Sequence, residues 1–224
     1  MHGKWNILFI ELVLISLLVF RLSVVIKRYK NLGKVGTFPE KIEIVLKQTF
    51  PKPVAVIVSR EISMIYYLLT KKSIQSEGEY FTYHKGVAYK GILIALISVI
   101  LIESIGLYFL LHKWNMIIAW IHIGLNVYGL LYLVSDYRAI LQRPFFIHEG
   151  HLKITLGSRR QITIPLSEVD SIENGSGFEK EKKKKDIFKA VLLEFDTPQI
   201  KINLKEPILT EDFLGRPQKI SKVY

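Results

Sequence analysis

The chain has 224 residues, 50% of them hydrophobic, and its mean hydropathy is +0.26. It also carries 31 Lys and Arg against 20 Asp and Glu, which gives a formal net charge of +11. Positive hydropathy beside so many charges places apolar and charged residues in separate blocks, which is unusual for a soluble domain. The absence of cysteine excludes a disulfide framework, cysteine-based zinc sites and thiol catalysis.

Three hydrophobic blocks, over residues 5–26, 91–111 and 116–135, predict membrane-spanning helices. Each block has about the ~20 residues needed to cross a ~30 Å hydrocarbon core. Only residues 112–115 separate the second and third blocks, so these two helices form a tight antiparallel hairpin. The first block continues into Lys27 and Arg28 without a small-residue cleavage site, which favours an uncleaved anchor over a signal peptide.

The distribution of basic residues predicts the orientation of these helices. Residues 27–90 contain twelve Lys and Arg and residues 137–224 contain sixteen, whereas residues 1–4 and 112–115 contain one each. The positive-inside rule then places the N-terminus outside and both long segments in the cytoplasm, in an inner or plasma membrane. Because topology accounts for the basic charge, we expect no nucleic-acid partner. The expected order is an anchor (1–26), a cytosolic helical segment (27–90), a transmembrane hairpin (91–136) and a cytosolic β domain (137–224).

Residues 54–70 predict an amphipathic helix that either lies on the inner leaflet or packs on the cytosolic domain. Its polar arc comprises Ser59, Arg60, Ser63, Tyr67 and Thr70, and its apolar side comprises Val54, Ile57, Val58, Ile62, Ile65 and Leu69. Glu61 falls within the apolar side. It is therefore a candidate buried carboxylate with a cationic or hydroxyl partner, unless the helix lies on the membrane and the carboxylate reaches sideways. The aromatic run over residues 80–89 predicts a belt at the membrane interface.

The C-terminal region predicts short strands over residues 144–148, 151–156, 161–165, 188–195, 199–204 and the last residues, KISKVY. Turn residues separate these strands, which is typical of an antiparallel sheet that is curled or barrel-like. A short polar stretch, residues 166–174, follows the strand over residues 161–165. The expected fold is an α+β membrane protein.

The run from Arg143-Pro144 through HEGHLKITLG to ITIPLSEVDSIE resembles the PH-like domains of bacterial multi-pass membrane proteins. The helical hairpin preceded by YFTYHKG is similar to a family of such proteins with a C-terminal PH-like domain. The resemblance covers roughly residues 79–220 and implies a hairpin after the last span, a Gly turn and a barrel. PH-like folds usually close with a C-terminal helix, which here is missing or supplied by residues 40–70. The resemblance implies no activity and no site residues.

Two groups of residues are candidate sites. The basic run Lys182, Lys183, Lys184 and Lys185 is either a solvated loop or a contact for anionic lipid, worth about 1 kcal/mol per basic residue at the surface. Glu11, Glu103 and His122 all fall roughly 9–12 Å below the outer membrane surface. Ionisable groups at such a depth usually face the bundle interior and pair, so these three form either a helix clamp or a proton or ion path.

The sequence predicts no cofactor, because it has no nucleotide-binding or serine-hydrolase motif and no histidine spacing typical of a metal site. We therefore expect a non-enzymatic, membrane-tethered interaction module that contacts the bilayer and binds protein, anionic lipid or a second copy of itself. The alternative is a small membrane enzyme or an ion-handling subunit that uses the Glu11, Glu103 and His122 group.

Overall fold

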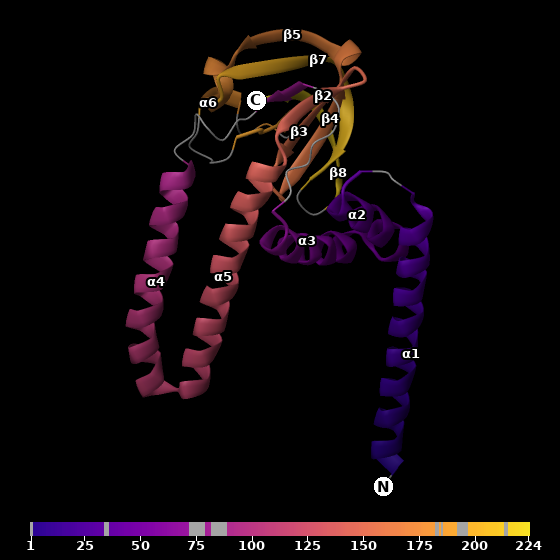
Figure 1. The fold of residues 1–224 in the computed structure, drawn as a ribbon, viewed down its shortest axis with the longest axis vertical. Helices are drawn as coiled ribbons and strands as arrows, with labels where there is room; N and C mark the ends of the chain where they lie inside the picture. The colour runs from indigo at the N-terminus through magenta and orange to yellow at the C-terminus, as the bar shows by residue number, and fades with distance from the viewer. Residues whose placement is uncertain are drawn as a thin grey trace. The chain divides into compact units, whose positions relative to one another are not determined.

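The computed structural model describes residues 2–33, 36–71, 79–81, 89–181, 184, 186–191, 197–212 and 215–224 (Figure 1). The chain forms two compact units, Met1–Ile62 and Ser63–Tyr224.

The first unit contains α1 (His2–Asn31), α2 (Phe38–Thr49) and the first part of α3 (Lys52–Leu69). Two arginines of α1 bind the end of α2. Arg21 donates to the Thr49 carbonyl at 2.6 Å, and Arg28 donates to the Gln48 carbonyl. These carbonyls have no partner within the helix, so the guanidinium groups cap α2 and hold it against α1.

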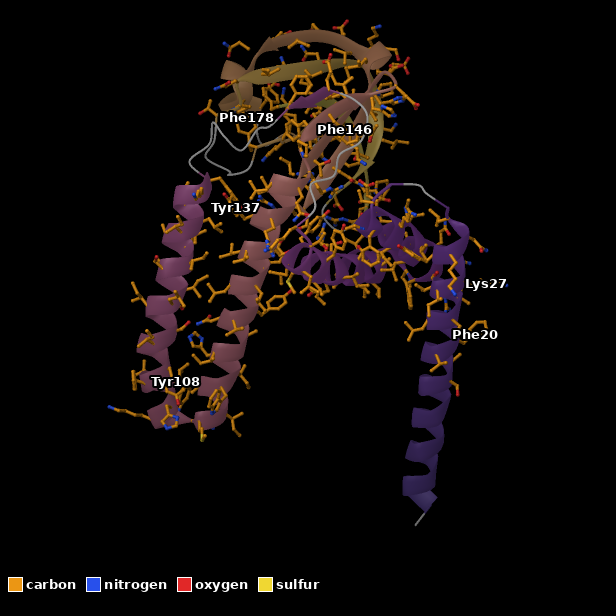
Figure 2. All side chains as sticks on the ribbon, in the orientation of Figure 1. Phe20, Lys27, Tyr108, Tyr137, Phe146 and Phe178 are labelled. Atoms are coloured by element: carbon orange, nitrogen blue, oxygen red, sulfur yellow. The ribbon has the colours of Figure 1, made fainter. Side chains whose placement is uncertain are left out.

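The second unit contains the predicted helical hairpin, formed by α4 (Tyr89–Trp114) and α5 (Met116–Gln142). Asn115 is the single residue between them, and its side chain accepts hydrogen bonds from the backbone N–H groups of Ile117 and Ile118 at 2.8 and 3.3 Å. Tyr108 lies near this turn and stacks on His112, whereas Tyr137 lies toward the other end of the hairpin (Figure 2). Both helices are long and apolar enough to cross a membrane.

The described part of the chain contains two such helices rather than the three predicted. The described side chains of α1 include only a short apolar stretch. They also include four basic residues: Arg21, Lys27, Arg28 and Lys30. The side chains of residues 1–15 lie outside the described residues. The anchor over residues 1–26 therefore stays a prediction.

The rest of the second unit forms two four-stranded sheets, with strand orders β1-β2-β3-β4 and β5-β7-β8-β6. The strands of the first sheet are β1 (Glu79–Phe81), β2 (Phe145–His148), β3 (His151–Leu156) and β4 (Arg160–Pro165). Those of the second are β5 (Val169–Asn174), β6 (Ile187–Phe188), β7 (Ile200–Glu211) and β8 (Pro217–Val223). Short helices lie at η2 (Leu166–Glu168), η3 (Gly175–Gly177) and α6 (Phe178–Glu181).

The two sheets share one hydrophobic core, and the hairpin contributes to it. Strand residues of the core include Ile154, Ile164 and Ile220, which are buried together with Ile140 of α5 and Tyr89 of α4. The two strands predicted around Gly157 form the β3–β4 hairpin, in which Ile154 lies opposite Ile162. The α+β class and the predicted β3–β4 hairpin are therefore confirmed.

The structure differs from the prediction in four details. The aromatic run supplies β1, which pairs with β2, so Glu79–Phe81 belong to a sheet. Helix α5 continues to Gln142, beyond the predicted end of the hairpin. Part of the polar stretch over residues 166–174 is β5, which pairs antiparallel with β7. The strand predicted over residues 188–195 is β6, which is short and parallel to β8, so the second sheet is mixed; residues 192–196 lie outside the described residues.

Candidate functional site

The predicted intramembrane group is only partly described, and His122 is placed with other partners. The amide Nδ2 of Asn126 lies 3.0 Å from His122 Nε2 and donates to Ser104 Oγ at 2.7 Å. Glu103 is exposed on α4, and the side chain of Glu11 lies outside the described residues. Helices α4 and α5 are thus joined by a polar clamp of Ser104, Asn126 and His122, in which Glu103 takes no part.

The predicted lipid-contact run is described only at Lys184. Its ammonium group is exposed and lies 2.9 Å from Glu181 Oε1. Three of the four lysines lie outside the described residues: Lys182, Lys183 and Lys185. Because a carboxylate engages Lys184, this residue offers less net charge to a lipid headgroup than an isolated lysine.

Glu181 is the centre of a small polar cluster on the second sheet. Its carboxylate contacts Lys222 Nζ at 2.9 and 3.0 Å and accepts a hydrogen bond from the Tyr224 hydroxyl at 2.6 Å. The hydrogen bonds from Tyr224, Lys184 and Lys222 lower the pKa of Glu181 to about 2. Burial and the neighbouring carboxylate raise the pKa of Tyr224 above its usual range. Glu181 is therefore ionised at neutral pH and fixes α6 to β8.

Helix α3 buries the side that the sequence marks as polar. Ala55, Ser59, Ser63 and Tyr67 are buried, together with Val56 and Met64 on the flanks of this side. The apolar side is exposed at Val54, Ile57, Val58, Ile65 and Leu69. Glu61, the candidate buried carboxylate, is half-buried. The helix thus contacts the protein through small and polar side chains and leaves its large aliphatic side chains uncovered.

A buried carboxylate that the sequence analysis did not single out lies where α5 enters the sheets. Asp136 is 3% exposed, and its Oδ2 accepts a hydrogen bond from the Tyr89 hydroxyl at 3.0 Å. Arg159 Nη2 lies 3.1 Å from the same oxygen, and Ser158 N and Oγ lie 3.4 and 3.3 Å from Oδ1. We name Tyr89, Asp136, Ser158 and Arg159 the Asp136 cluster. It ties the start of α4 and the end of α5 to the β3–β4 turn.

The backbone of that turn is shaped to admit the carboxylate. Gly157 has φ +55°, and a Cβ atom there would lie 2.6 Å from Asp136 Oδ1 and 3.1 Å from Ile140 Cγ1. Only glycine combines this left-handed conformation with so close an approach. Arg143 adds a further link, because its guanidinium donates to the Gly157 carbonyl at 3.2 Å and to Gln161 Oε1 at 2.8 Å.

The other face of the same stretch of α5 binds the end of α3. Ser135 Oγ donates to the Met64 carbonyl at 3.0 Å, and Gln142 Nε2 donates to the Thr70 carbonyl at 2.8 Å. Between them, Arg138 donates to the Leu68 carbonyl. Residues 135–142 are thus a junction with the Asp136 cluster on one face and the carbonyl groups of α3 on the other.

The sequence carried one signal for this junction. Asp136 is the first acidic residue after the long apolar block, and an isolated carboxylate at that position requires a partner. Its partners could not be found locally, because Tyr89 and Arg159 come from distant segments. All carboxylate oxygens of the cluster face hydrogen-bond donors, so its chemistry is that of a fixed ion pair that holds helices and sheet in one arrangement.

No family model matches the chain, and no curated protein or solved structure shows significant similarity to it. Within the described residues, no group of three or more His, Asp or Glu side chains is arranged to hold a metal ion.

Proposed function

We propose that this chain is an integral membrane protein that holds a non-enzymatic interaction module on the cytoplasmic side of a membrane. One observation carries the proposal: α5 is a single helix whose first part is apolar and exposed and whose end is buried in the core of the sheets. From Ile94 to Val134, Ala119 is the only buried residue, whereas Ile140 is 0% exposed. An apolar surface of this length is stable in a bilayer and unstable in water. The module is therefore attached rigidly to the membrane.

The orientation in this proposal follows from the charges. The turn at residues 112–115 has one basic residue, whereas the sheets and their loops are rich in Lys and Arg. The positive-inside rule places the turn outside and the sheets in the cytoplasm. The first hydrophobic block, over residues 5–26, adds a third span with its N-terminus outside.

The module itself is PH-like in this proposal. Its support is the arrangement of two four-stranded sheets around one core that a helix enters. That helix is the end of α5, which precedes every strand of the module except β1, so the span takes the place of the usual C-terminal helix. The ligand is a protein or an anionic lipid headgroup, and we assign its contact to the basic run Lys182, Lys183, Lys184 and Lys185.

Photo-crosslinking in native membranes tests the interaction. A photoreactive amino acid replaces Lys184 or Lys219, both of which are exposed on the module, and Lys113 in the turn of the hairpin serves as the control. We expect discrete adducts from Lys184 or Lys219 and none of the same mass from Lys113. A lipid adduct shifts the mass by less than about 1 kDa, whereas a protein adduct adds the mass of a chain. The absence of adducts from both module positions would contradict the proposal.

A further inference from the structure

The proposed function leaves the uncovered aliphatic side of α3 unused. The side chains of Ile57 and Ile65 are 55% and 54% exposed, and that of Leu69 is 78% exposed. With Val54 and Val58 they form one stripe along the helix, since their spacing follows the helical repeat. We name these five residues the α3 stripe. An exposed stripe of this kind marks an interaction surface.

The end of α3 is held at the level where the apolar part of α5 stops. Ser135, Arg138 and Gln142 come directly after the exposed apolar stretch that ends at Val134. They bind the carbonyls of Met64, Leu68 and Thr70, at and just after the end of α3. This end of α3 crosses α5 rather than running along it (Figure 1). A helix fixed in this way lies beside the boundary between hydrocarbon and headgroups when the hairpin spans a bilayer.

The charges of α3 suit the same boundary. Lys52 begins the helix and Lys71 follows its end, and both are exposed. Basic residues at the ends of an amphipathic helix contact phosphate groups while its apolar side enters the acyl region by ~5–10 Å. The half-buried Glu61 interrupts the stripe, and a carboxylate there limits insertion to this shallow depth.

We propose that α3 lies in the plane of the membrane, with the α3 stripe inserted at the headgroup–acyl boundary of the leaflet that faces the module. The hairpin and the α3 stripe then both contact the bilayer. The proposal rests on the membrane insertion of the hairpin in the proposed function. The module is thus held by the hairpin and by a lateral support.

Depth-resolved fluorescence quenching tests the proposal, and the lack of cysteine makes single labels unambiguous. The full chain is reconstituted in nanodiscs of phosphatidylcholine and phosphatidylglycerol with an environment-sensitive label at Ile57→Cys or Ile65→Cys. Leu125→Cys, exposed in the apolar part of α5, is the control for the hairpin, and Lys219→Cys is the control for aqueous exposure. Nitroxides at shallow or deep acyl positions and iodide in water are the quenchers.

We expect the labels at Ile57 and Ile65 to be quenched most by the shallow nitroxide. Iodide should quench their fluorescence at least about threefold less than it quenches the label at Lys219. Iodide quenching equal to that of Lys219 would overturn the proposal. Protection from iodide and nitroxides alike would also overturn it, because a protein such as a second copy of the chain would then cover the stripe. The deep nitroxide reports on Leu125 separately, so failure of the hairpin to insert is distinguishable from failure of α3 alone.

Discussion

Replacement of Asp136 with alanine is expected to lower the free energy of unfolding by about 3 kcal/mol. The carboxylate is buried, faces the guanidinium of Arg159 at 3.1 Å and accepts the hydroxyl of Tyr89 at 3.0 Å. Its removal leaves Arg159 without its counter-charge and the buried Tyr89 hydroxyl without its acceptor. Both groups then stay desolvated with no interaction that compensates for the loss of water. Differential scanning fluorimetry and denaturant titration of the purified protein in detergent measure the change.

Two variants separate the ion pair from mere cavity formation. Ser158→Ala removes only the weak hydroxyl contact at 3.3 Å and is expected to cost less than about 1 kcal/mol. The double variant Asp136→Leu with Arg159→Met replaces both charges by apolar groups and is expected to be more stable than Asp136→Ala. A stability of Asp136→Ala equal to that of Ser158→Ala would show that the cluster does not hold the junction together.

Gly157→Ala is the second substitution with a large expected effect, also about 3 kcal/mol. The new methyl group meets Asp136 Oδ1 at 2.6 Å, and the left-handed φ of +55° strains any residue with a Cβ atom. The β3–β4 turn must therefore move away from α5, which weakens the Asp136 cluster. Denaturant unfolding measures the loss, and hydrogen exchange at the N–H of Ser158 reports on the turn directly.

Gly150→Ala is the matched control for Gly157. Gly150 has φ +72° in the β2–β3 turn, but a Cβ atom there meets nothing within 4 Å. This variant therefore carries only the backbone strain, which costs about 1 kcal/mol. If both variants lose the same free energy of unfolding, the close approach of Gly157 to Asp136 does not contribute to stability.

Features of the fold that depend on residues close together in the sequence were predictable. The long apolar blocks predict α4 and α5, and the short run HLKITL with the Gly turn after it predicts the β3–β4 hairpin. Strand β1 was missed, because three residues have little local preference and this strand exists only by pairing with β2. The parallel pairing of β6 with β8 is equally non-local.

The site residues show the same division. The pattern of α3 predicts two faces, but periodicity alone does not say which face meets the protein, and the structure covers the polar one. His122 was expected beside Glu103, whereas Asn126, one turn away on the same helix, takes that place. The Asp136 cluster was missed because its members lie far apart in sequence and meet only when the sheets fold onto the end of α5.

The most direct test of the account is the accessibility of single cysteines in intact cells, because the whole account depends on a hairpin that crosses the membrane. Trp114→Cys places a thiol at the turn of the hairpin, and Lys219→Cys places one on the exposed surface of β8. The natural chain has no thiol and gives no background. A membrane-impermeant maleimide is predicted to label Trp114→Cys in intact cells and to label Lys219→Cys only after permeabilisation. Labelling of Lys219→Cys in intact cells, or equal labelling of both positions, would contradict the account.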